Sequence, residues 1–247
     1  MKPVRVYIKA RYLGGYVHAH YNYYLQSFFY KALPPKVRKS LHDMGVEEGP
    51  RRFKMFTFSR IYGDFSRDEG RLLYRDFVYF AFSSALDSVV KYLYEYLNSN
   101  PEFGIDKAKF IVDKVLVKNF DKELASKGLF YTLSPVVVTK RTAEGSRYLF
   151  PHQLEYDYLI KLNMKRKVLA LTGKVFKTDL EVRVENWRRS VTKYKRTRVE
   201  GVMGKFKLTG TLTVLKVAYE AGLGVKNSQG FGMLEFEGTS LRDLLGE

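Results

Sequence analysis

The 247-residue sequence contains no cysteine, four histidines and one tryptophan. The lack of cysteine excludes disulfides, thiol catalysis and zinc sites built on cysteine. Four histidines leave few side chains for a metal site, and we expect no metal and no cofactor. Long apolar runs are missing as well: the longest strongly apolar stretch, Phe77–Phe82, is far below the roughly 20 residues that a membrane helix needs. Because no cationic and then apolar leader begins the chain, we expect a cytoplasmic protein without a membrane partner.

Negative charge is also scarce, since 43 Lys and Arg face 26 Asp and Glu, for a net charge of +17. Residues 1–123 carry 21 basic and 14 acidic side chains, and residues 124–247 carry 22 and 12, so neither half is a detached basic arm. Hydrophobic residues make up 45% of the chain, which suffices for a packed core and excludes a disordered basic protein. A polyanionic partner is the usual reason for such a charge.

The densest basic run lies between Arg183 and Arg198 and contains a single acid, Glu185. Trp187 and Tyr194 lie within it, so cations that neutralise phosphates alternate with rings that can stack on bases. We predict that part of this run contacts nucleic acid; a solvated strand face is the alternative. The candidate contacts are Arg183, Arg188, Arg189, Lys193, Lys195, Arg196 and Arg198.

Apolar periodicity predicts a similar order of elements in both halves. Asn22 is a plausible cap for the first helix, and Pro34 and Pro35 end it. The elements expected in the first half are a strand at Val4–Lys9, a helix from Asn22, a short helix at Val37–Met44, extended stretches at Met55–Ile61 and Leu72–Phe82 around a polar turn (Gly63–Gly70), a helix opened by Ser84 and ended by Asn100-Pro101, and a strand at Phe110–Val117.

The second half is expected to follow the same order. Its elements are a strand at Phe130–Thr139, a helix after Pro151 with Leu154, Tyr158, Leu159 and Leu162 as its apolar stripe, strands at Leu180–Glu185 and Val191–Arg198, an extended stretch at Lys205–Leu208, a helix at Thr211–Ala221 and a strand at Gly232–Glu237. Each half therefore reads β-α-β-β-α-β, which is the ferredoxin-like unit. We predict an α+β fold of two tandem ferredoxin-like domains with antiparallel sheets, at 1–123 and 124–247, joined near Lys118–Gly128.

A glycine loop, Gly222–Gly232, is the sharpest local pattern, with the spacing G-x-G, five residues, G-x-G. No Gly-Lys-Ser/Thr closes it, so it is not a P-loop, and it follows a helix and precedes a strand, unlike a dinucleotide fingerprint. It could form a helix cap and turn, pack the helix on the sheet, or bring amides to an RNA backbone. The candidate RNA contacts here are Gly222, Gly224, Lys226, Asn227, Ser228, Gln229, Gly230 and Gly232.

This loop, at the end of a basic chain with two ferredoxin-like units, resembles the CRISPR-associated endoribonucleases that process repeat RNA, in the repeat-associated mysterious protein superfamily. Tyr21–Tyr30 resembles the first helix of the archaeal members, and Leu133–Val138 resembles the strand that opens their second domain. The resemblance reaches both halves. It implies CRISPR repeat RNA, single-stranded or weakly structured, as the partner, and it allows other CRISPR subunits; a homodimer is compatible with the sequence.

The resemblance also implies a reaction without metal, in which the 2′-hydroxyl attacks the adjacent phosphorus and leaves a 2′,3′-cyclic phosphate and a 5′-hydroxyl. Archaeal members use a tyrosine on the first helix, a histidine shortly after it and a lysine beyond, which gives Tyr30, His42 and Lys54 as catalytic residues here. Such chemistry needs proton transfer and a cation for the phosphorane. Arg51 and Arg52 are rival phosphate ligands.

Helical geometry supports these assignments in part. Tyr30 lies roughly 170° from the apolar stripe of its helix, and His42 roughly 130° from the stripe of the next, so both are expected to project away from the core. His18 and His20, in a loop before the first helix, are alternatives to His42. A surface tyrosine, an inert histidine and a solvated strand lysine are the structural alternatives.

Three hypotheses follow. The first is a metal-independent endoribonuclease that cuts CRISPR repeat RNA and releases guide RNAs. The second is a non-catalytic repeat-RNA-binding paralogue or a structural subunit of an interference complex, since the same fold and loop serve both. The third, a general RNA-binding protein, needs only the charge and the aromatic residues.

Overall fold

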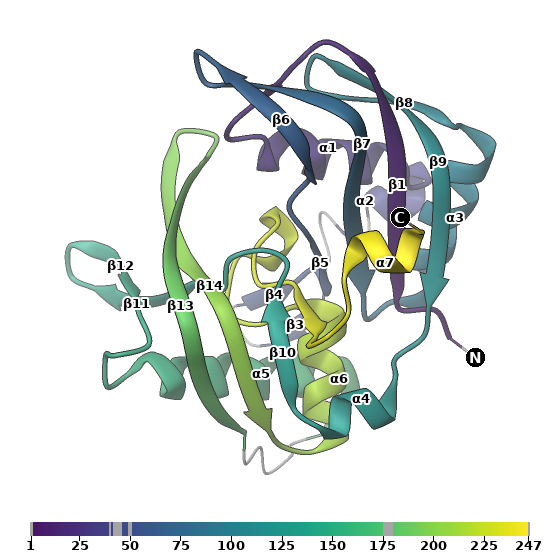
Figure 1. Ribbon diagram of the computed structural model, residues 1–247. Coiled ribbons are helices and arrows are strands. Elements are labelled where there is room, and N and C mark those ends of the chain that lie inside the picture. The colour runs from purple at the N-terminus through teal and green to yellow at the C-terminus, as the bar shows by residue number, and fades with distance from the viewer. Residues whose placement is uncertain (1, 40, 42–45, 49–50, 175–179, 247) are drawn as a thin grey trace.

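The computed structural model describes residues 2–39, 41, 46–48, 51–174 and 180–246. The chain forms two antiparallel sheets with helices packed against them (Figure 1). None of the helices within these ranges is long and apolar enough to cross a membrane. The same ranges contain no group of three metal-ligating side chains.

The N-terminal sheet has the strand order β2-β7-β1-β9-β8, and β5 and β6 also pair with β7. Helices α1 and α3 pack on one face of it around Leu25, Phe29, Val90 and Leu93. The strands are β1 (Arg5–Gly14), β2 (Val17–His18), β5 (Phe56–Phe58), β6 (Tyr62–Asp68), β7 (Arg71–Ser84), β8 (Glu102–Ile105) and β9 (Ala108–Lys118), and the helices are α1 (Asn22–Lys31), α2 (Pro35–Lys39) and α3 (Asp87–Ser99). A separate hairpin pairs β3 (Val46–Glu48) with β4 (Arg51–Phe53).

The C-terminal sheet has the strand order β13-β14-β10-β15, with α5 and α6 packed on it around Ile160, Met164 and Leu215. Its strands are β10 (Leu129–Thr132), β13 (Glu181–Tyr194), β14 (Thr197–Thr209) and β15 (Leu234–Phe236); β11 (Val138–Thr142) and β12 (Gly145–Leu149) form a side hairpin. The helices are α4 (Lys122–Ser126), α5 (Tyr156–Thr172), α6 (Leu212–Ala221) and α7 (Leu241–Leu245), with a 3₁₀ turn η2 (Asn227–Gln229).

Both sheets place the strands of one β-α-β-β-α-β unit in the order second, third, first, fourth. In the first half these strands are β5/β6, β7, β1 and β9, and in the second half β13, β14, β10 and β15. This is the ferredoxin-like arrangement, so the predicted α+β fold with two such units is confirmed. The first sheet ends at Lys118 and the second begins at Leu129, with α4 between them. The proposed boundary at 123 stays a prediction.

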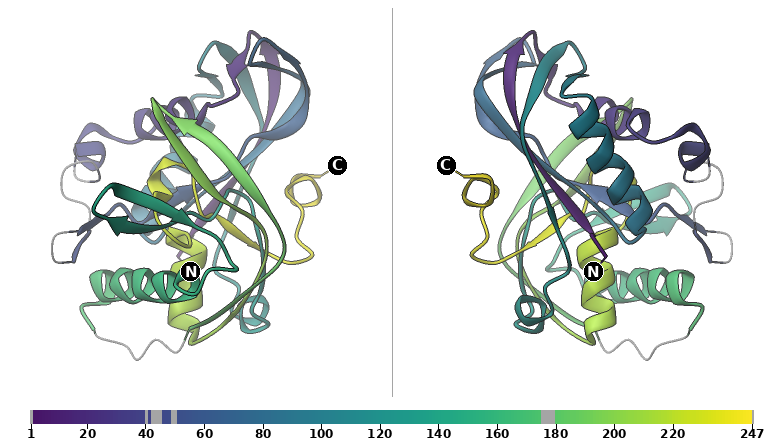
Figure 2. Two further views of the ribbon diagram at one scale, coloured as in Figure 1. Left: turned by 90° about the vertical axis from the view of Figure 1, so that its left-hand side faces the viewer. Right: turned by 90° about the vertical axis from the view of Figure 1, so that its right-hand side faces the viewer.

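The free face of the N-terminal sheet is covered by the C-terminal half. Tyr7 and Tyr79 on this face share a buried cluster with Leu133 and Met233, and α7 adds Leu241. Figure 2 shows α7 set apart from the other helices, near the C-terminus. The two units therefore share buried surface and are held as one body.

Several expected boundaries are wrong. Gly63–Asp68 is not a polar turn but most of strand β6, and the turn is confined to Glu69 and Gly70. Ser84 ends strand β7 instead of opening a helix, and α3 starts at Asp87. The two strands expected between Leu180 and Arg198 are one long strand, β13, and the turn into β14. Exposure explains the errors at β6 and β13, because these strands project beyond the core and carry polar residues on both faces.

The apolar stripe expected for the helix after Pro151 is also wrong. Leu154 precedes α5 and is fully exposed, and Tyr158 is exposed. The buried side of α5 includes two polar residues, Asn163 and Lys167. Polar side chains on a buried face lower the apolar periodicity, which hid the correct face from the sequence.

Candidate functional site

Helix α1 makes contacts on two of its sides. Leu25, Phe28 and Phe29 pack on the N-terminal sheet. On another side, Asn22 donates its amide hydrogens to the carbonyls of Gln229 (2.8 Å) and Gly230 (3.2 Å). Asn22 was expected to cap the helix, but it is the first helical residue and binds the glycine loop instead.

Gln26, one turn after Asn22, continues this contact by donating to the carbonyl of Ser228, and it accepts a hydrogen bond from Tyr194 of the β13–β14 hairpin. Tyr30 follows one further turn along, because residues four apart lie on one side of a helix. This side of α1 therefore joins the N-terminal unit to the glycine loop, with Tyr30 at its C-terminal end.

Tyr30 and Lys54 lie together. The Lys54 Nζ is 5.6 Å from the centre of the Tyr30 ring, and that ring packs edge-on against Phe56 at 5.7 Å. Tyr30 is half-buried, not fully projecting as helical geometry had predicted. Burial, and to a smaller degree Tyr194, raises the pKa of Tyr30 to about 12. Its hydroxyl therefore keeps its proton near neutral pH and can donate it.

His42, the third predicted catalytic residue, lies outside the described residues. Arg51 and Arg52 lie on β4, the strand that leads to Lys54. Their contacts with RNA stay predictions.

The glycine loop is packed inside the protein. Gly222, Gly224, Gly230 and Gly232 are buried and have positive φ angles. A Cβ at Gly230 would lie 2.3 Å from the Phe58 ring, and one at Gly232 would lie 1.9 Å from the carbonyl oxygen of Leu223. Close packing accounts for these four glycines. Their predicted RNA contact is untested, and so is that of Gln229, whose carbonyl accepts from Asn22.

A buried lysine holds the loop from the other side. The Lys167 Nζ donates to the carbonyls of Gly222 (2.6 Å) and Gly224 (3.0 Å) and to Asn227 Oδ1 (2.6 Å). All three ammonium hydrogens thus have acceptors. Burial lowers the pKa of Lys167 to about 7. Asn227 in turn donates to the carbonyls of Leu223 and Phe231, so its side chain is engaged within the loop.

The seven basic residues predicted to bind RNA on the β13–β14 hairpin are all exposed. Arg189 and Arg198 both pair with Glu200, and the Lys195 Nζ lies 4.9 Å from the centre of the Tyr23 ring. The two rings of this run are engaged with protein, which sequence reasoning did not expect. Trp187 stacks on His152 and Phe150, and Tyr194 bonds Gln26.

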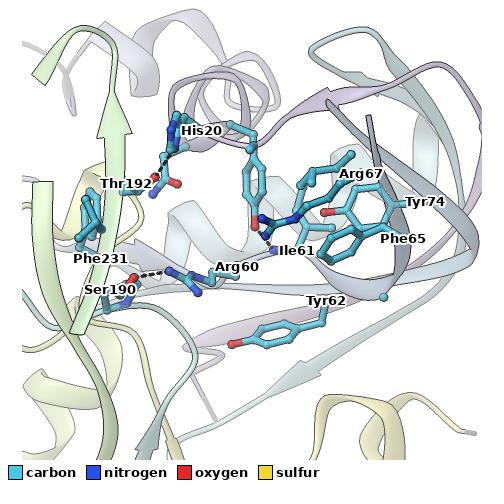
Figure 3. Close-up of a pocket in the computed structure, with 17 residues that line it drawn as sticks. His20, Arg60, Ile61, Tyr62, Phe65, Arg67, Tyr74, Ser190, Thr192 and Phe231 are labelled. Carbon is cyan, nitrogen blue, oxygen red and sulfur yellow. Dashed lines mark hydrogen bonds between the residues drawn. The ribbon is translucent and has the colours of Figure 1, made fainter. Parts of the chain in front are cut away.

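A cleft of about 450 Å³ separates the hairpin from the N-terminal sheet (Figure 3). Arg60 donates to Ser190 across it, and Tyr62 lines it. His20 reaches the hairpin from the other end, with its Nδ1 3.1 Å from Thr192 Oγ1. Burial, and then the charge of Lys193, lowers the pKa of His20, so the ring is neutral near pH 7.

The two alternative histidines thus differ. The His18 Nδ1 lies 2.6 Å from Asp106 Oδ2, away from the cleft lining, whereas His20 faces the cleft. Arg60, Tyr62 and Arg67 also line the cleft and were missed from the sequence. Arg67 lies in the segment predicted as a turn, Tyr62 just before it, and Arg60 in the stretch predicted as extended. Only the packing of the two units brings them opposite the hairpin.

Two family models cover most of the chain. The model described as CRISPR associated protein Cas6, C-terminal, matches residues 118–236. The model described as CRISPR-associated protein Cas6, N-terminal, matches residues 16–116.

Curated relatives agree with these models. A CRISPR-associated endoribonuclease Cas6 of Pyrococcus furiosus is 30% identical over 232 residues, which covers 88% of this chain and 83% of the relative. One from Methanocaldococcus jannaschii is 26% identical over 87% of this chain and 85% of its own length. A solved structure described as that of a Cas6-related gene from Pyrococcus furiosus has a TM-score of 0.81 at 23% identity, covering 96% of this chain and all of the other. Another, described as a RAMP protein binding different RNA substrates, has a TM-score of 0.78 at 24% identity and covers 94% of this chain and 98% of that one.

Proposed function

The chain belongs to the Cas6 family of CRISPR-associated endoribonucleases, and from this premise we propose that it cuts CRISPR repeat RNA without a metal ion and so releases guide RNAs. The observation that carries the proposal for this chain is the pairing of Tyr30 with Lys54 beside the glycine loop. A phenol that keeps its proton and an ammonium group are what cleavage of a phosphodiester by its own 2′-hydroxyl requires, together with a base.

In the proposed reaction the 2′-oxygen attacks the adjacent phosphorus and the bond from phosphorus to the 5′-oxygen breaks. His42 takes the proton of the 2′-hydroxyl, as its imidazole suits transfer near neutral pH. Tyr30 donates its proton to the departing 5′-oxygen, because its pKa of about 12 keeps the hydroxyl protonated until then. Lys54 stabilises the charge that collects on the phosphorane. The products are a 2′,3′-cyclic phosphate and a 5′-hydroxyl.

The exposed basic residues supply the affinity for RNA in this proposal. Seven of them lie on the β13–β14 hairpin, and Arg60 and Arg67 line the cleft beside it. Phosphate contacts of this kind bind RNA without reading its sequence. Lys226 and Ser228 are half-buried residues of the glycine loop that line a pocket together with Lys54, and they would extend this path.

Incubation with repeat RNA in EDTA tests the proposal. We expect one internal cut whose upstream product ends in a cyclic phosphate. Tyr30→Phe, His42→Ala and Lys54→Ala should each slow the cut by about 100-fold or more, within the range for loss of a general acid or base. Tyr94→Phe, at an exposed tyrosine of α3, is the matched control and should cut at the normal rate.

Intact RNA in EDTA with normal binding would refute the endonuclease reading and favour a non-cleaving paralogue or a subunit of a larger complex. A strict requirement for a divalent cation would refute the metal-free mechanism alone. Equal affinity for repeat and scrambled RNA would support a general RNA-binding protein.

A further inference from the structure

A second pocket, of about 310 Å³, opens next to the Tyr30–Lys54 pair. Lys54 itself lines it, and so does Phe56, the residue on which the Tyr30 ring packs. Apolar side chains form much of its wall, with Phe53 from β4 and Val225 from the glycine loop. The pocket is therefore formed by both units and lies at the place where we expect the RNA to be cut.

Asn163 of α5 brings a polar group into this pocket. The residue has a relative exposure of only 5%, and it lines the pocket. Among the described residues, no side chain or backbone group donates a hydrogen bond to its Oδ1. Lys167, one turn along the same helix, differs in that three acceptors satisfy it. A buried amide oxygen without a donor costs stability, and a bound group that donated a hydrogen bond to it would remove that cost.

We propose that this pocket takes one unpaired nucleobase next to the scissile phosphate, and that Asn163 reads its edge. The proposal rests on the proposed function, since the base must belong to an RNA strand that passes Tyr30 and Lys54. Flat apolar surfaces suit the faces of a base, and a carboxamide offers an acceptor beside a donor. Adenine and cytosine both present the complementary pair, an exocyclic amine beside a ring nitrogen, and adenine is the base that we expect because its larger ring has more surface to pack on the apolar wall.

The charges around the pocket fit this occupant. Lys54 and Lys226 both line it, and no acidic side chain does so among the residues described. A base in the pocket would place the phosphates on either side of it near these ammonium groups. The pocket is also large enough for one base but at the lower end of the range for larger ligands.

Binding measurements test the proposal without relying on cleavage. Repeat RNAs are prepared in which each base in turn is replaced by an abasic nucleotide. If the wild type cuts the unmodified RNA, every probe also carries a 2′-deoxy sugar at the mapped cut position. Affinity is measured in EDTA for the wild type and for Asn163→Leu, which keeps the volume and removes the amide. At one position, next to the cut, the abasic change should weaken the wild type by about 10-fold or more, and Asn163→Leu should reduce this penalty to about 3-fold or less.

A second variant, Asn163→Asp, replaces the donor by another acceptor. We expect it to change which base is preferred at that position, an effect that loss of packing would not produce. Asn98→Leu, at an exposed asparagine of α3, is the matched control and should leave every abasic penalty unchanged. Thermal unfolding confirms that each variant is folded.

The outcomes separate the two proposals. If no position shows an abasic penalty that depends on Asn163, the base pocket is refuted, whether or not the RNA is cut. If the Asn163-dependent position exists but the RNA stays intact, the pocket is supported and the endonuclease mechanism is refuted. If the wild type does not bind repeat RNA at all, both are refuted.

Discussion

Glu235→Leu should strongly destabilise the protein, because Glu235 is one half of a fully buried ion pair between the two units. Arg5 of β1 donates to Glu235 Oε2 at 2.8 Å, and both side chains are at most 1% exposed. Tyr7 donates to the same carboxylate at 2.7 Å. Arg5 also donates to the backbone carbonyls of Leu234 and Tyr219 and lies 3.5 Å from the centre of the Tyr219 ring.

The expected magnitude follows from this burial. Removal of one partner of a buried ion pair leaves the other charge without compensation and costs about 3–5 kcal/mol. The two carbonyls that remain on Arg5 are dipoles and do not neutralise it. For a chain of this size, 1 kcal/mol lowers the melting temperature by about 2–4 °C. We therefore expect Glu235→Leu to melt about 6–20 °C below the wild type.

Thermal and urea unfolding, followed by circular dichroism, measure the effect. The double variant Arg5→Met/Glu235→Leu should melt closer to the wild type than Glu235→Leu does, since removal of both charges of a buried pair is often nearly neutral. Glu155→Leu is the control: Glu155 pairs with Lys140 at an exposed site, and such pairs contribute about 0–1 kcal/mol. A melting temperature for Glu235→Leu no lower than that of Glu155→Leu would refute the reasoning, and so would a double variant less stable than Glu235→Leu.

Four further predictions concern the loop, the cleft and the hairpin. The pKa of Lys167 is about 7 in the folded chain and 10.5 in the unfolded one, so the unfolded chain binds more protons between these values and the free energy of unfolding should rise with pH across this window. Urea unfolding at pH 7 and pH 9.5 should show a rise of at most about 1.4 kcal/mol per pH unit, which Lys167→Met should lack; an equal rise in the variant would contradict the assignment. Gly230→Ala places a methyl group against Phe58 at positive φ and should cost at least about 1–3 kcal/mol, as read from its melting temperature, whereas an unchanged melting temperature would contradict the packing role. His20→Ala should leave the single-turnover cleavage rate within about 10-fold of the wild type, while a loss of about 100-fold or more would make His20 the general base in place of His42. Arg196→Glu should weaken RNA binding and reduce the slope of log affinity against log salt by about 1, and an unchanged slope would place the RNA elsewhere.

The fold could be predicted from the sequence because the buried strands and most helices carry clear apolar periodicity. Strand β7 and helix α6 are of this kind. The errors in the other elements arise because their polar residues do not follow this pattern. Strand β6 carries Asp64, Ser66 and Arg67 because it projects from the core, and α5 buries Lys167 because that residue serves the glycine loop. Local periodicity reports burial against apolar neighbours, and it fails where a strand leaves the core or a polar group is buried with partners.

The candidate site was predictable to the extent that it depends on local motifs. The sequence predicted the helix that contains Tyr30 and the segment that contains Lys54, and the structure brings the two residues together. The cleft could not, since Arg60 and His20 meet the hairpin only after the two units pack. The packing role of the glycines was only one of several predictions for the loop. The local sequence does not show whether protein or RNA will occupy the space that a missing side chain leaves.

The glycine loop links the packing of the units to the chemistry. Its 3₁₀ turn, η2, contacts both α1, which contains Tyr30, and β5, which follows Lys54 in the sequence. Asn22 holds the loop from α1 and Lys167 holds it from α5, and each donates to backbone carbonyls of the loop, so these two side chains set the position of Tyr30 relative to the C-terminal unit. Close contact of this type requires glycine, as any Cβ at Gly230 would separate α1 from the loop. The spacing of the glycines is therefore explained by the contact that the loop makes with α1 and β5. In the proposed mechanism, cleavage would depend on the loop through the placement of Tyr30 and Lys54, whether or not the loop also contacts RNA.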